Sequence, residues 1–225
     1  MDLILFLLLT AAYIGLLVWA AASQKEWTLM AFAYFVVLGL VYDNGIIALG
    51  KFIGEGALLE NLNALRFWIH AFFTPALALY SLGAVRQAGV KWANKSWALY
   101  AAWAFFVLLV IIEIWQVTWG TELEPVREYG VLKYTSAEEA SGPPWMIVLV
   151  SAALLAAGAI VWKKASWAWM FVGAVIMGIG SSVTIPVDSA AVTNIFELIL
   201  LTSLVWTKIH LEKKQTEKKR GRNDE

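Results

Sequence analysis

Cysteine is absent from this 225-residue chain, and histidine occurs only twice, as His70 and His210. Without cysteine the chain can form no disulfide, thiolate metal site or iron–sulfur cluster, and it has no cysteine nucleophile. Two histidines are too few for a zinc site with three histidine ligands in one chain. We therefore predict neither a metal site nor a cofactor.

Charged residues are also scarce. They make up 15% of the chain, whereas 60% of its residues are hydrophobic, and the mean hydropathy is +0.69; a soluble domain is about one quarter charged. The 17 basic residues balance the 17 acidic ones, so no net charge favours nucleic acid as a partner. The composition predicts a multi-pass protein of the cell membrane.

Apolar runs of about 20 residues, the length of a helix that crosses the hydrocarbon core, recur along the whole chain. Only helices and closed barrels satisfy their backbone within lipid, and the alternating pattern of barrel strands does not occur. The sequence therefore predicts an all-α membrane protein, a seven-transmembrane helix bundle that forms one domain over residues 1–209. The predicted spans are residues 3–23, 27–49, 63–85, 97–119, 144–162, 167–187 and 190–209.

The lysines and arginines predict the orientation, because basic residues favour the cytoplasmic side. With seven spans, most of them fall on the side of the C-terminus, so we expect the N-terminus outside and the C-terminus inside. Residues 210–225 then form a basic cytoplasmic tail, which we expect to be frayed. The acidic segment 120–143 falls outside, where it could cover a vestibule as a loop. The basic residues on the outer side are Lys51, Arg66, Arg127 and Lys133.

Ionisable side chains inside the predicted spans are the strongest functional signal. Each costs about 2.5–3.5 kcal/mol to insert unless it is paired or hydrated. At the rise of an α-helix, those of this chain lie roughly 5–10 Å below the outer surface. Because they come from four spans and one depth, we expect them to face a common cavity open to the outer half of the membrane. The candidate catalytic residues are Asp43, His70, Glu113 and Glu197.

Other polar side chains of the same layer are predicted to bind the substrate. Arg66, His70 and Thr74 are spaced i, i+4 and share one helix face, and Glu113 and Gln116 are spaced i, i+3. The first and fifth spans carry no ionisable residue, so we place them at the periphery. The candidate substrate-binding residues are Asn44, Arg66, Thr74, Gln116 and Asn194.

The first functional hypothesis is an intramembrane enzyme that acts on a lipid or isoprenoid, as an isomerase, cyclase or hydrolase. An apolar pocket favours the neutral form of a carboxyl group, so Glu113 or Asp43 can act as an acid with His70 as the base. Arg66 suits a phosphate or carboxylate head group. Hydrolysis at an oxygen-rich metal site of the same side chains is an alternative, although a single histidine disfavours zinc.

The second hypothesis is a transporter, or a membrane protein that binds a lipid or small molecule without catalysis. The inner half of the predicted spans carries no ionisable residue, which disfavours a transport path. The polar layer could also only hold the helices together, but interhelical polar contacts contribute about 0.6 kcal/mol each, which is little against the cost of burial. The expected partner is a membrane lipid or isoprenoid, and a homo-oligomer is possible. The motifs Gly-x-Ser-x-Gly, His-Glu-x-x-His and the P-loop are missing.

Overall fold

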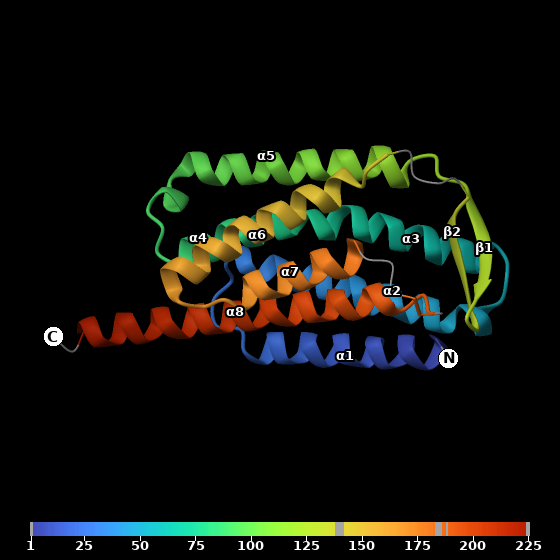
Figure 1. Ribbon diagram of the computed structural model, residues 1–225, viewed down its shortest axis with the longest axis horizontal. Helices are drawn as coiled ribbons and strands as arrows, with labels where there is room; N and C mark the ends of the chain where they lie inside the picture. The colour runs from blue at the N-terminus through green and yellow to red at the C-terminus, as the bar shows by residue number, and fades with distance from the viewer. Residues whose placement is uncertain (1, 138–141, 183–185, 188, 224–225) are drawn as a thin grey trace.

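The protein is a bundle of long helices with a two-stranded hairpin across one end, and the C-terminal helix extends beyond the other end (Figure 1). The helices are α1 (Asp2–Ala22), α2 (Phe32–Ile53), α3 (Ala57–Phe73), α4 (Leu77–Gln87), α5 (Ser96–Glu113), α6 (Trp145–Ala165), α7 (Trp169–Ser182) and α8 (Val192–Asn223). The computed structural model describes residues 2–137, 142–182, 186–187 and 189–223.

Six helical segments within the described residues are long and apolar enough to cross a membrane. The chain is thus a multi-pass helical membrane protein by helix length and hydropathy, as its composition predicts. Two of the segments include short 3-10 turns at Leu29–Ala31 and Thr74–Ala76, and a third ends in the π-helical turn Ile114–Thr118. The segments are Asp2–Ala22, Leu29–Ile53, Ala57–Gln87, Ser96–Thr118, Trp145–Ala165 and Val192–Glu217.

The predicted span 167–187 differs from the other six. It contains the 14-residue helix α7, which at 1.5 Å per residue is about 21 Å long and shorter than the roughly 30 Å hydrocarbon core. Helix α7 ends in Gly178-Ile-Gly-Ser-Ser182, whose glycines and serines are poor helix formers. Residues 183–185 of this predicted span lie outside the described residues.

The segment 120–143, which we expected to form an outer loop, contains a β-hairpin. Strands β1 (Leu123–Glu128) and β2 (Val131–Ser136) pair antiparallel. They are joined through Tyr129 and Gly130 at φ values of 48° and 91°, the left-handed conformation that tight hairpin turns require. The hairpin lies across one end of the bundle (Figure 1).

Contacts with α2 and α3 hold the hairpin against the bundle. Leu132 and Tyr134 form a buried apolar cluster with Leu59 of α3. The hydroxyl oxygen of Tyr134 accepts a hydrogen bond from the backbone N–H of Gly56 at 3.1 Å. The hairpin therefore covers the helix ends nearest the predicted polar layer.

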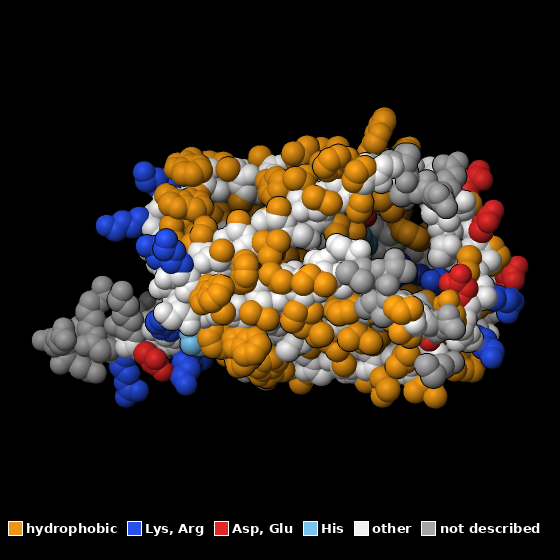
Figure 2. All heavy atoms as spheres, viewed as in Figure 1, with side chains coloured by type: hydrophobic (Ala, Val, Ile, Leu, Met, Phe, Trp, Pro, Cys, Tyr) orange, Lys and Arg blue, Asp and Glu red, His pale blue; other side chains and the backbone are white. Residues whose placement is uncertain are grey.

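The C-terminal segment is also more regular than expected. Helix α8 continues to Asn223, so the predicted frayed tail 210–225 is helical over nearly its whole length. Leu211 is 1% exposed and Glu212 is 5% exposed, and this burial stabilises the extension. Lysines and arginines gather at this end, and acidic residues cluster around the hairpin at the opposite end (Figure 2).

Candidate functional site

Asp43 and Arg66 form the first contact within the predicted polar layer. The Arg66 Nε donates to Asp43 Oδ1 at 2.7 Å, and Arg66 Nη1 donates to Asn63 Oδ1 at 2.6 Å. The Arg66 and Asp43 side chains are only 14% and 24% exposed, so the charge-assisted bond is partly shielded from solvent. The two predicted residues neutralise each other and join α2 to α3.

His70 lies one helical turn further along α3, between two oxygen-bearing side chains. Its Nδ1 is 3.2 Å from the hydroxyl of Thr74, and its Nε2 is 3.7 Å from Oε1 of Glu113 on α5. Pro75 has no N–H group with which to continue the helical hydrogen bonds of α3. The chain forms the 3-10 turn Thr74–Ala76 at this point, one helical turn after His70. Both nitrogens of the ring thus face groups that can exchange a proton, with Glu113 slightly beyond hydrogen-bond distance.

The helix that carries Glu113 changes its winding at this residue. Glu113 is the last residue of α5 and is followed by the π-helical turn Ile114–Thr118. A π-turn closes i to i+5, so the predicted shared face of Glu113 and Gln116 is lost. Gln116 is half-buried and does not line the cavities described below. Its predicted binding role has no support from this geometry.

A cavity of about 80 Å³ lies between helices α2, α3, α4, α6, α7 and α8. His70, Thr74 and Glu197 contribute its ionisable and hydroxyl groups together with Ser151, and the remaining wall is apolar. A smaller cavity of about 30 Å³ adjoins Asp43 and Arg66 and shares part of this wall, including His70 and Thr74. The apolar lining of the larger cavity is Val36, Leu40, Leu77, Ile147, Val150, Leu154, Met177, Leu200 and Leu201.

The larger cavity corrects the predicted position of the fifth span. That span is α6, which supplies Ser151 and three apolar residues of the wall, so α6 is not peripheral to the site. Its only polar contribution is a hydroxyl, and a search for ionisable residues therefore overlooks it.

Asn44 and Asn194, which were both predicted to bind the substrate, lie close together and are hydrogen-bonded to each other. Asn194 Nδ2 donates to Asn44 Oδ1 at 3.0 Å, and Asn44 Nδ2 donates to the carbonyl of Leu40 at 2.9 Å. Asn44 has no exposed surface. The amide pair joins α2 to α8 beside the cavity, where it fixes the helix that carries Glu197.

Tyr13 of α1 is a member of this layer that the sequence interpretation missed. Its hydroxyl donates to the backbone carbonyl of Asn194 at 2.9 Å, and the side chain is fully buried. We placed the first span at the periphery because it has no ionisable residue in its interior. A tyrosine in the middle of an apolar span indicates a buried hydroxyl group that needs a hydrogen-bond partner, and Tyr13 could have been found in this way.

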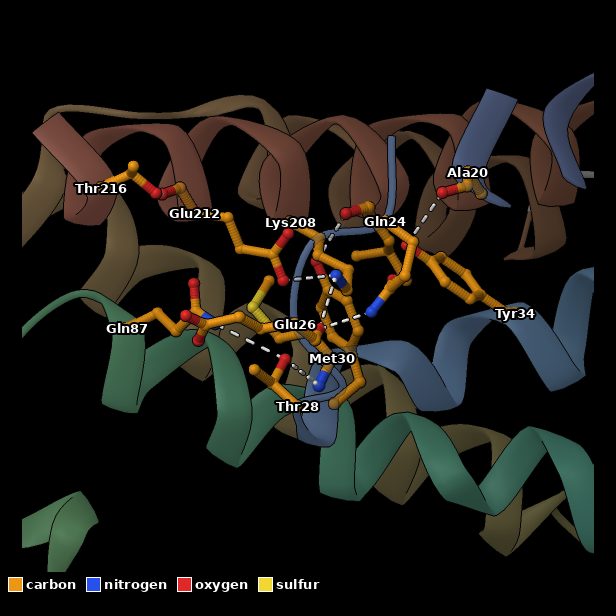
Figure 3. Close-up of polar contacts among 12 residues, drawn as sticks. Ala20, Gln24, Glu26, Thr28, Met30, Tyr34, Gln87, Lys208, Glu212 and Thr216 are labelled. Carbon is orange, nitrogen blue, oxygen red and sulfur yellow. Dashed lines mark hydrogen bonds and ion pairs between the residues drawn. The ribbon is translucent and has the colours of Figure 1, made fainter. Parts of the chain in front are cut away.

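A second polar cluster lies at the opposite end of the bundle (Figure 3). Lys208, with no exposed surface, forms an ion pair with Glu212. Its Nζ also lies 3.5 Å from the carbonyl of Glu26 and 5.5 Å from the centre of the Tyr34 ring. The i, i+4 spacing of Lys208 and Glu212 is the sequence signal that indicates this pair.

Among the residues that the structure describes, no three His, Asp or Glu side chains are grouped to hold a metal ion. The site consists instead of the ion pair Asp43–Arg66, the facing pair His70–Glu113, and Glu197 across a mostly apolar cavity. Comparison with protein-family models, with curated proteins and with solved structures found no match for this chain.

Proposed function

We propose that this protein is an intramembrane enzyme that acts on a membrane lipid or isoprenoid through acid–base chemistry of His70 and Glu113. The observation that carries the proposal is the placement of His70. Its side chain keeps 38% of its surface accessible although it lies inside the bundle on the wall of the apolar cavity. A histidine that is open to an apolar cavity and backed by a buried carboxyl group suits proton transfer to a hydrophobic substrate.

Each polar group has a distinct role in this mechanism. Thr74 orients the imidazole through Nδ1, so that Nε2 gives its proton to a substrate carbon and regains one from Glu113 once their 3.7 Å separation shortens by roughly 1 Å. Glu197, on the α8 wall, faces the same space and takes the proton that another substrate carbon loses. An isomerisation or cyclisation is then balanced, because one carbon gains a proton and another loses one.

Asp43 and Arg66 act as positioning residues in this proposal. Their mutual ion pair leaves neither as an isolated acid or base, which departs from the catalytic role predicted for Asp43. Arg66 also holds Asn63, and its remaining N–H groups can bind a phosphate or carboxylate head group. The substrate would therefore place its head near Arg66 and its reacting hydrocarbon in the cavity beside His70.

The proposed topology has seven crossings in the cell membrane, with the N-terminus outside. Helix α7 is the short crossing, and its Met177 lines the cavity. A cavity of about 80 Å³ is smaller than a lipid, so the substrate would enter from the outer leaflet by displacing this wall. The protein could do so as a monomer or as a homo-oligomer.

The alternative is a transporter or a lipid-binding protein without catalysis. It is favoured by one observation, namely that the other end of the bundle is not purely apolar. A cavity of about 640 Å³ opens there, and Lys208 and Glu212 are buried near it. Polar groups at both ends are what a substrate path requires.

The test uses purified protein reconstituted in liposomes made from a lipid extract that includes isoprenoids, with untargeted mass spectrometry of the lipids. Wild-type protein should convert one lipid class, and His70→Ala or Glu113→Gln should reduce the rate about 10²- to 10⁴-fold. The matched controls are His210→Ala, the other histidine, and Glu124→Gln, an exposed hairpin carboxylate. Both controls should keep the wild-type rate.

The result that contradicts catalysis is a wild-type protein that leaves every lipid unchanged. A solute or lipid that then crosses the liposome membrane only with protein present would establish the alternative. Size-exclusion profiles and thermal unfolding must show that the His70 and Glu113 variants are folded. Loss of assembly in both variants would mean that the polar layer serves to hold the helices together.

A further inference from the structure

A third cavity, larger than the two at the proposed catalytic site, lies at the end of the bundle opposite the hairpin. It has a volume of about 640 Å³ and opens between the start of α2, the end of α4 and the extension of α8. One wall carries Trp27, Phe32 and Phe35, and the other carries Arg86 and three amide side chains. The cavity is therefore amphipathic along its length.

Three amide side chains line this space, namely Gln87, Asn94 and Gln215. The NH2 group of Gln87 faces the Thr28 hydroxyl at 3.5 Å (Figure 3). Those of Asn94 and Gln215 donate to the carbonyls of Val90 and Gln87, at 3.3 and 3.2 Å.

The Gln87 oxygen Oε1 is buried and has no hydrogen-bond partner within the described part of the chain, so it is closed to a ligand in the cavity. Because the NH2 groups of Asn94 and Gln215 are engaged within the protein, the amide oxygens of these two side chains are the acceptors left for a ligand that brings hydroxyl groups.

Arg86 gives the same wall a positive charge. Its Nε donates to the carbonyl of Ala93 at 2.6 Å, which fixes the plane of the guanidinium. Arg66 and Arg127 pair with carboxylates, whereas in the part of the chain that the structure describes no carboxylate forms an ion pair with Arg86. A fixed guanidinium without an acidic partner is suited to a phosphate group.

The opposite wall has the character of a hydrocarbon contact. Phe35 is 43% exposed and belongs to the span Leu29–Ile53. Phe35 lies in the first turn of α2, and Trp27 lies in the non-helical segment before it. Trp27 is a residue type that lies at membrane interfaces, so this wall suits an acyl chain that continues from a head group.

We propose that this cavity binds an anionic phospholipid whose head group carries hydroxyl groups, such as phosphatidylglycerol. Arg86 binds the phosphate, the amide oxygens of Asn94 and Gln215 accept from the head-group hydroxyls, and an acyl chain lies along Phe32 and Phe35. The site is separate from His70 and Glu113, and it does not rest on the proposed enzymatic function.

The experiment titrates delipidated protein in detergent with phosphatidylglycerol and counts bound lipid by native mass spectrometry. Arg86→Gln should lower the affinity about tenfold, because it removes a charge-assisted contact with the phosphate. The control Arg127→Gln changes an exposed arginine at the hairpin end and should bind as wild type does. Phosphatidylcholine, whose head group lacks hydroxyls and carries no net negative charge, should bind more weakly than phosphatidylglycerol.

Asn94→Ala provides a second variant if Arg86→Gln fails to fold, because Asn94 is exposed. It should weaken phosphatidylglycerol binding several-fold. Equal affinities for wild type and for the folded variants would overturn the proposal, as would equal binding of phosphatidylcholine. Competition by free glycerol 3-phosphate at the same concentration would also overturn it, since the site would then bind a soluble phosphate ester.

Discussion

Arg66 Nε and Asp43 Oδ1 are 2.7 Å apart. This ion pair joins α2 to α3 and lines the 30 Å³ cavity whose wall includes His70. The pair explains how two ionisable residues are tolerated in adjacent apolar helices, because each charge satisfies the other. It also separates the polar layer into a neutralised pair and the residues His70, Glu113 and Glu197, which are available for chemistry.

Substitutions in this pair should show strong energetic coupling. Asp43→Asn leaves the Arg66 guanidinium without a counter-charge, and Arg66→Gln leaves the Asp43 carboxylate without one. In either variant the unpaired charge lowers the free energy of unfolding. The double variant removes both charges, so its loss of stability should be smaller than the sum of the single losses by about 1–3 kcal/mol. Unfolding of the four proteins in the same detergent measures this, and strictly additive losses would show that the contact contributes nothing.

Filling the apolar cavity should stop turnover without changing any ionisable group. Ser151 lines the cavity on α6, so Ser151→Leu places extra carbon atoms where the substrate would bind. We expect the rate of lipid conversion to fall at least about tenfold, because the larger side chain occupies the space of the substrate or overpacks the cavity wall. The neighbouring Ala152 is exposed on the same helix, and Ala152→Leu should keep the wild-type rate; a similar loss in both variants would argue against this cavity as the site.

The hairpin depends on a close approach at Gly50. A Cβ atom at this position would lie 1.9 Å from the backbone carbonyl oxygen of Leu132, so Gly50→Ala must displace strand β2 from α2. The expected result is faster proteolysis within the hairpin. Gly15→Ala is the control, since nothing lies within 4 Å of its added Cβ, and alanine should raise helix stability there by about 1 kcal/mol. Unchanged cleavage of Gly50→Ala would show that the hairpin does not pack as described.

The absence of cysteine makes the orientation directly testable. A single cysteine at Glu124, exposed on the hairpin, or at Lys95, exposed at the opposite end, is the only thiol in its variant. The distribution of basic residues predicts that Glu124→Cys reacts with an impermeant maleimide on intact cells. Lys95→Cys should react only after permeabilisation, and the reverse pattern would contradict the predicted orientation.

The sequence predicted the parts of the fold that composition and length control. Six apolar segments of spanning length follow from hydrophobic run length alone. The length of α7 was not predictable in this way, because the apolar run continues beyond the glycine and serine residues that end the helix. The β-hairpin was missed because its docking depends on Leu59 and Gly50, which are distant in sequence from the strands.

The site was predictable to a similar degree. Ionisable residues at one depth on four helices identified the groups that now lie near one another, including His70 opposite Glu113. The i, i+3 spacing of Glu113 and Gln116 assumes a continuous α-helix, and the π-turn Ile114–Thr118 could not be foreseen from that periodicity. Helical periodicity also gave no indication that Asn44 and Asn194 bind each other, since that contact depends on how α2 packs against α8.

The most direct test of the central claim is lipid conversion in water that carries both deuterium and oxygen-18. An isomerase or cyclase that uses His70 and Glu113 should place deuterium on a carbon of its product, and a hydrolase should place oxygen-18 in its product. The account predicts one labelled lipid with wild-type protein and with His210→Ala, and none with folded His70→Ala or Glu113→Gln. A wild-type sample without any labelled lipid, or labelling that persists in the His70 and Glu113 variants, would contradict it.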